Sequence, residues 1–169
     1  MTDTIICGVD DSDAAGGVAR VAGDLAELMG ARLVLVNVPP ASMIMPPPGR
    51  VPRAAAVDEQ QVLARRRVRS EELIEAVARD AGLLGAAQSR VSPGHPAERL
   101  LEEARAEEAA LIVVGSRAQG ALRSALLGSV SAAVLRGAPC PVVVVPLEVA
   151  QTARPPREER QPSPPPATR

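Results

Sequence analysis

The chain contains no phenylalanine, tryptophan or tyrosine and no lysine, so its 19 basic residues are all arginines. Without lysine, neither a P-loop of the GxxxxGK[ST] type nor Schiff-base chemistry is available. Without aromatic rings, there is no platform on which a nucleic-acid base would stack. The formal net charge of −1 also differs from the basic surface of nucleic-acid binders. We therefore expect no nucleic-acid partner, and a bound adenine would have to pack between aliphatic side chains.

Cysteines and long apolar runs are also scarce. The two cysteines, Cys7 and Cys140, are too few for a disulfide scaffold, and Cys7 lies in an apolar run where a buried, reduced thiol is expected. The first residues lack the basic and apolar regions of a signal peptide, and no run approaches about 18 apolar residues. The sequence predicts a cytoplasmic protein without a membrane partner.

Short runs rich in β-branched residues indicate the strands. Four of them are continuously apolar apart from Thr4 and Asn37 and show no alternation, which is typical of parallel strands covered by helices on both faces, and a fifth, at 87–91, is weaker. The predicted strands are 4–9, 33–38, 87–91, 111–114 and 142–145. Helical apolar spacing separates them, which predicts the order βαβαβαβαβ. We expect an α/β fold with an open, twisted, five-stranded parallel sheet, doubly wound and Rossmann-like or flavodoxin-like, with helices on both faces.

The helices are predicted from apolar residues three or four positions apart. The first has the stripe Val18, Val21, Leu25 and Leu28, with Ser12 or Asp13 as the N-cap. The others have Leu73, Ile74, Val77 and Leu84; then Leu100, Leu101 and Ala104 after Pro96; and last Leu122, Leu126, Val130 and Val134.

Two segments lack this periodicity. A proline-rich loop at 39–56 interrupts the domain, which we place at residues 1–147. Residues 148–169 are rich in proline, arginine and glutamate, a composition that predicts a tail without fixed structure.

The residues after the strand that ends at Val114 indicate a phosphate-binding loop. Gly115 follows this strand, and the segment from Gly115 to Ser129, which includes Gly128, enters the predicted last helix. Ligands of such sheets bind at the carboxyl ends of the strands. Glycines let backbone N–H groups approach a phosphate, and a helix N-terminus adds unpaired N–H groups. The alternative is a purely structural role, in which Gly115 permits a turn and Gly128 allows close helix packing.

With these motifs, the sequence resembles the universal stress protein family over residues 3–146. The family's nucleotide signature is Gly, two residues, Gly, nine residues, Gly and Ser or Thr, and it falls here on Gly115, Ala118, Gly128 and Ser129. The segment GVDDS, with Asp10 in the acidic position, and APCPVVVV at 138–145 are also similar to family members. Ala118 departs from the pattern, since it replaces the second glycine and would cost about 1 kcal/mol if that residue needs a positive φ.

The resemblance implies an adenine-nucleotide ligand, ATP, with or without Mg²⁺. The implied adenine and ribose contacts are Gly8, Val9, Asp10 and Val38. The implied phosphate contacts are Gly115, Arg117, Gly128, Ser129 and Val130, with Ala118 and Ser131 in the same motif. The resemblance also implies a homodimer through Val142, Val143, Val144 and Val145. No charge or bulge protects this expected edge strand.

Several functions stay open at this point. The leading hypothesis is a nucleotide-binding regulatory module of the stress response that acts without efficient catalysis. The alternatives are a nucleotide-independent interaction protein and a slow ATP hydrolase or adenylyl-transferring enzyme, which fold analogy alone supports. No catalytic residue or metal cluster is assigned. Asp10 is interpreted as a ligand contact, with capping of the first helix as the alternative.

Overall fold

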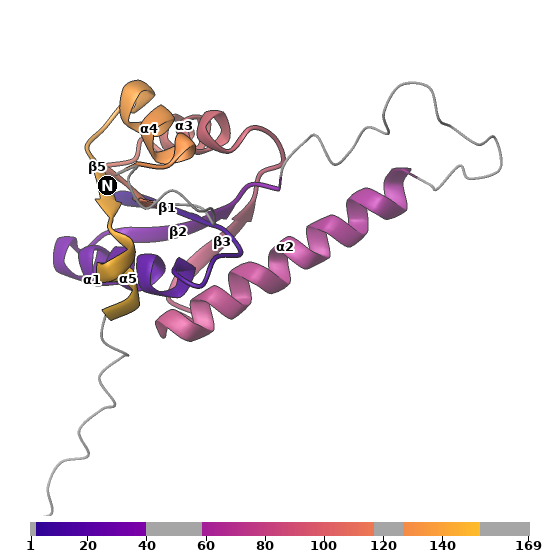
Figure 1. Cartoon of the computed structure of the whole chain (residues 1–169), viewed down its shortest axis with the longest axis horizontal. Coiled ribbons are helices and arrows are strands. Elements are labelled where there is room, and N and C mark those ends of the chain that lie inside the picture. The colour runs from indigo at the N-terminus through magenta and orange to yellow at the C-terminus, as the bar shows by residue number, and fades with distance from the viewer. Residues whose placement is uncertain (1–2, 40–58, 117–126, 153–169) are drawn as a thin grey trace, which may run out of the picture.

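A computed structural model describes residues 3–39, 59–116 and 127–152 of the chain (Figure 1). Its five strands are β1 (Thr4–Val9), β2 (Arg32–Asn37), β3 (Ala87–Val91), β4 (Leu111–Gly115) and β5 (Val142–Val145). All neighbouring strands pair in parallel, in the order β3-β2-β1-β4-β5. The predicted fold class is confirmed, and the expected strands at 4–9, 87–91 and 142–145 have the observed bounds.

Helices cover both faces of this sheet. They are α1 (Ala15–Met29), α2 (Glu59–Ala81), α3 (Pro96–Ala106), α4 (Ser129–Gly137) and α5 (Leu147–Thr152). Helices α1, α2 and α5 pack on one face, and α3 and α4 pack on the other (Figure 1). Among these described helices, none is long and apolar enough to cross a membrane.

The central strands are buried on both faces. In β1, Ile5 and Cys7 point towards α1 and α2, whereas Ile6 points towards α3 and α4, and all three are fully buried. Successive side chains of a strand alternate between the two faces, so a strand covered on both sides is apolar at nearly every position. This double burial explains the continuous apolar runs in the sequence.

Helix ends differ from the sequence predictions. Helix α1 has Ala14 as its N-cap without a side-chain hydrogen bond, so the predicted caps Ser12 and Asp13 are wrong. Its predicted stripe is too long, since Leu28 is 83% exposed. Leu84 lies beyond the end of α2 and is also exposed. Leu122 and Leu126 of the last predicted stripe lie outside the described residues.

The predicted tail begins too early. Residues 147–152 form α5, which packs against α1 and buries Ala150. Composition predicted no fixed structure here because the charged and polar residues of α5 lie on its exposed side. The buried contact is made by Ala150, a small residue. The rest of the tail, from 153 onward, and residues 40–56 of the proline-rich loop lie outside the described residues.

Candidate functional site

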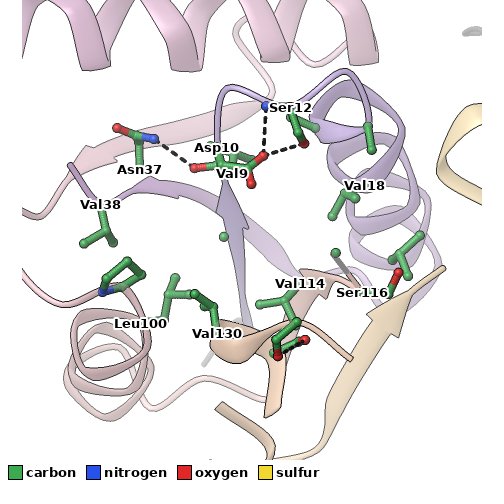
Figure 2. Close-up of a pocket in the computed structure, with 18 of the residues that line it drawn as sticks. Val9, Asp10, Ser12, Val18, Asn37, Val38, Leu100, Val114, Ser116 and Val130 are labelled. Carbon is green, nitrogen blue, oxygen red and sulfur yellow. Dashed lines mark hydrogen bonds between the residues drawn. The ribbon is translucent and has the colours of Figure 1, made fainter. Parts of the chain in front are cut away.

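A cavity of about 290 Å³ opens at the carboxyl ends of β1, β2 and β4 (Figure 2). The starts of α1, α3 and α4 form its other walls. The chain leaves β1 towards β2 on one side and reaches β4 on the other, so the cavity lies at the point where the strand order reverses. Ligands of open α/β sheets bind at this point.

The described residues of the predicted site all line this cavity. They are Gly8, Val9, Asp10, Val38, Gly115, Gly128, Ser129, Val130 and Ser131. Arg117 and Ala118 lie outside the described residues. The structure therefore brings together residues from four separate segments of the sequence, while their role as ligand contacts stays a prediction.

One end of the cavity is apolar. Val38, Leu100, Val114 and Val130 lie around it in Figure 2, and Pro96 at the start of α3 adds to it. Gly8 has a structural role here, because a Cβ on Gly8 would lie 2.9 Å from Leu100 Cδ1. A side chain at this position would displace Leu100 from the cavity wall.

The start of α4, beside Val130, contributes polar groups to the cavity. Gly128 is the N-cap, with φ −71° and ψ 164°, and no side chain caps the helix. Other residues also adopt these angles, so the backbone alone does not require glycine at Gly128. The Gly128 N–H donates to the Ser116 carbonyl at 2.6 Å. The first N–H groups of a helix lack acceptors within it, so those of Ser129 and Val130 are suited to an anion.

Ser131 contributes to the fold of this turn. Its hydroxyl donates to the Gly128 carbonyl at 3.0 Å, and the residue is only 2% exposed. Ser129, by contrast, is exposed at the cavity. Of the two serines, Ser129 is the one whose side chain is accessible to a ligand.

Asp10 organises the turn between β1 and α1. Its Oδ1 accepts hydrogen bonds from the Ser12 N–H at 3.1 Å and from the Ser12 hydroxyl at 2.6 Å. Since α1 has no side-chain cap, the alternative of Asp10 as a helix cap is wrong. The carboxylate is exposed and borders the cavity, where it can accept a hydrogen bond from a ligand.

Sequence reasoning missed several cavity residues. Asn37, at the end of β2, is buried and donates from Nδ2 to the Val9 carbonyl at 2.9 Å. A single polar residue at the end of an apolar run was the available signal. Leu147 of α5 also lines the cavity, and no sequence pattern pointed to it.

The titratable groups of the core are not part of this site. Burial raises the pKa of the Cys7 thiol to about 12, and Cys7 is absent from the cavity lining. In the part of the chain that the structure describes, no three His, Cys, Asp or Glu side chains are grouped to hold a metal ion.

With this topology, the molecule is an open, doubly wound α/β sheet of the Rossmann-like type, and comparisons give the family. The chain belongs to the universal stress protein family, whose family model matches residues 1–146. A universal stress protein from Thermus aquaticus is 36% identical over 146 residues, which cover 86% of this chain and 99% of the relative.

Solved structures share the fold. A universal stress protein in complex with cAMP has a TM-score of 0.62 at 23% identity and covers 86% of this chain and 98% of its own. The universal stress protein from Archaeoglobus fulgidus in complex with dAMP has a TM-score of 0.54 at 21% identity, with coverage of 86% and 98%. At these sequence identities, the similarity shows that the chain shares the fold of these proteins.

Proposed function

We propose that this chain binds an adenine nucleotide, with ATP as the ligand, in the cavity at the carboxyl ends of β1, β2 and β4. One observation carries the proposal: the start of α4, with exposed Ser129, lies on the same cavity as a group of aliphatic side chains. The start of α4 is suited to a phosphate, and the aliphatic side chains are suited to a base. Family members solved with cAMP and dAMP support an adenine ligand.

The base would pack against the apolar end. Val38, Leu100 and Val130 offer aliphatic surface there. Burial of apolar area stabilises a complex by roughly 25 cal/mol per Å², so flat aliphatic walls replace part of what aromatic stacking supplies elsewhere. Asp10, at the rim, is suited to accept a hydrogen bond from the ribose.

The phosphates would lie at the start of α4. One exposed contact with a helix dipole contributes only about 0.3–1 kcal/mol, whereas micromolar binding needs about 8 kcal/mol. The N–H groups of Ser129 and Val130 must therefore act together with the base contacts. Arg117 and Arg123, outside the described residues, are the countercharges that we propose for a triphosphate.

We assign the site to binding without efficient catalysis. Asp10 and Asp11 are the ionisable side chains among the described residues of the cavity wall. Asp10 is hydrogen-bonded to Ser12, which suits a structural or ribose contact. A Mg²⁺ ion that accompanies ATP would bind chiefly to phosphate oxygens, with these carboxylates nearby. Rapid, Mg²⁺-dependent release of ADP by the pure protein would overturn this assignment.

The nucleotide-bound protein would act as a regulatory homodimer of the stress response. Strand β5 is at the edge of the sheet, and Val142, Val143 and Val144 are half-buried there. A bare apolar edge strand favours pairing with another strand. A second copy of β5 is the partner that we propose.

Isothermal titration with ATP, ADP, AMP and cAMP tests the nucleotide site, with Ser129→Asp as the diagnostic variant. A carboxylate at the first position of α4 favours the helix dipole but repels a phosphate. We expect unchanged or higher stability and affinity weaker by about tenfold or more, since like charges in contact cost several kcal/mol. The matched control, Ser129→Asn, should keep binding. Absence of heat with all four nucleotides, or equal affinity of Ser129→Asp and Ser129→Asn, would contradict the proposal.

A further inference from the structure

Helix α5 extends the chain beyond the region that defines the family. The family match ends at residue 146, and α5 begins at Leu147. The helix turns away from the end of β5 and lies against α1 (Figure 1). A helix of six residues is too short to be stable alone. Its order therefore depends on its contact with α1.

That contact is between two backbones. A Cβ built on Gly17 of α1 would lie 2.5 Å from the carbonyl carbon of Ala150 and 2.7 Å from its Cα, and closer still to its carbonyl oxygen. Ala150 is 5% exposed. Glycine is a poorer helix former than alanine. Helix α1 has this unfavourable residue at the point where α5 requires the space.

The same helix contributes to the cavity. Leu147 is half-buried, lines the cavity and packs against the core on the α1 side. Residues three apart in a helix lie on the same face, as Leu147 and Ala150 do. In α1, Gly17 contacts α5 and its neighbour Val18 lines the cavity. When Ala150 packs on Gly17, the same helix therefore places Leu147 in the cavity wall.

We propose that Leu147 is a positioning residue of the ligand site and that docking of α5 on Gly17 is coupled to nucleotide binding. This inference rests on the proposed nucleotide function. Docked α5 closes the wall of the cavity beside Val18 and Val145 and keeps water away from the ligand. Coupling between two sites is reciprocal, so bound nucleotide also holds α5 in place.

The first test compares two glycines of α1 in the full-length chain. Gly17→Ala places a methyl group in the backbone of α5. Its control, Gly16→Ala, adds the same methyl group at the neighbouring position, where it faces Asp80 of α2 and not α5. The Cβ would lie 3.1 Å from the Asp80 Cβ, so the Asp80 side chain must shift by a few tenths of an ångström. We expect Gly17→Ala to bind AMP and ATP about five- to tenfold more weakly, within the usual range of coupling, and Gly16→Ala to bind as the wild type does.

Hydrogen exchange of the α5 amides supplies a readout that a purely structural role would not change. In the wild type, saturating AMP should slow exchange at residues 147–152, and in Gly17→Ala exchange should be fast with or without AMP. A second pair of variants covers the case in which Gly17→Ala does not fold. Leu147→Ala should weaken binding about threefold or more, while Val149→Ala, in the same helix but 46% exposed, should not.

The outcomes separate the two proposals. One outcome would overturn the coupling and leave the nucleotide site intact. In it, the wild type binds adenine nucleotides, Leu147→Ala and Val149→Ala bind them with equal affinity, and AMP does not change hydrogen exchange in α5. Failure of the wild type to bind any adenine nucleotide would overturn the nucleotide site and the coupling together. Selective weakening in Gly17→Ala and Leu147→Ala supports both.

Discussion

At the scale of single residues, Asn37 joins the ends of β1 and β2 at the cavity. Its Nδ2 donates to the Val9 carbonyl, and Asn37 is 8% exposed. A buried carbonyl that loses its donor costs about 1–3 kcal/mol. Asn37 thereby holds the backbone of Val9 and Asp10 at the rim of the site.

Replacement of Asn37 by aspartate should destabilise the protein in a pH-dependent way. At neutral pH the carboxylate faces the Val9 carbonyl, and we expect a loss of about 1–3 kcal/mol in the free energy of unfolding. Protonation restores a donor, so the loss should shrink as the pH falls. Urea unfolding at pH 7 and pH 4 measures this, with Asn37→Ala as the control whose loss has no such dependence. Equal losses at both pH values for Asn37→Asp would contradict the role of the hydrogen bond.

The two thiols should differ in reactivity. Cys7 is fully buried, and burial raises its pKa to about 12, whereas Cys140 is partly exposed and burial raises its pKa as well. Because thiolate is the reactive form, Ellman's reagent at pH 8 should label Cys140 in the native protein and Cys7 only after unfolding. The variant Cys140→Ser should show no fast native thiol. Two fast thiols in the native wild type would contradict the burial of Cys7.

At the scale of elements, an ion-pair network ties β2 and β3 to α3. Arg90 pairs with Glu103 and Glu107 at 2.7 Å each, and Arg32 pairs with Glu107 at 2.9 Å. The hydrogen bond from Arg90, assisted by Arg32, holds the pKa of Glu107 below its ordinary value. Such a carboxylate stabilises the fold above its unfolded-state pKa, and this stabilisation is lost as the pH falls through its folded-state pKa.

Neutralisation of Glu107 should therefore matter at pH 7 and lose its effect in acid. We expect Glu107→Gln to cost about 1 kcal/mol at pH 7, at the upper end for partly exposed pairs, and much less at pH 3. The control is Glu71→Gln, which breaks an exposed pair with Arg67 on α2 and should cost at most about 0.5 kcal/mol. Urea unfolding of both variants measures the loss in the free energy of unfolding. Equal losses for Glu107→Gln and Glu71→Gln at pH 7 would contradict the structural role of Glu107.

At the scale of the whole molecule, the backbone of β5 shows which groups are free to pair. The Ile112 N–H donates to the Pro141 carbonyl at 3.1 Å, and the Ser116 N–H donates to the Val145 carbonyl at 2.8 Å. Alternate residues of a strand direct their backbone groups to opposite sides, so Val142 and Val144 direct theirs to the open edge.

A proline at Val144 should separate the proposed dimer without breaking the sheet. Val144→Pro removes an N–H that faces the open edge, which edge strands tolerate. Light scattering after gel filtration should give the monomer mass of 17.5 kDa for this variant and twice that mass for the wild type. Val144→Ala keeps the N–H and should stay dimeric. A monomeric wild type, or a dimeric Val144→Pro, would contradict pairing through β5.

Much of this molecule was predictable from local sequence. The central strands are buried on both faces, so each left a continuous apolar run, and right-handed connections between parallel strands predict a doubly wound sheet. The same logic placed the ligand site at the carboxyl ends of the strands, after Val114 in particular, whereas Gly8 was implied by the family resemblance. Helix ends were harder, because Ser12 was expected to cap α1 and instead donates to Asp10.

The sequence by itself determined the fold class, the edge of the sheet that carries the cavity and the family, because apolar runs and glycine spacing are local records of burial and close backbone approach. Only the tertiary structure decided what surrounds that cavity. Asn37 reaches Val9 across two strands, and Leu147 reaches the cavity because Gly17, far away in the chain, leaves space for Ala150. Such contacts depend on shape complementarity between distant segments, which no local pattern records.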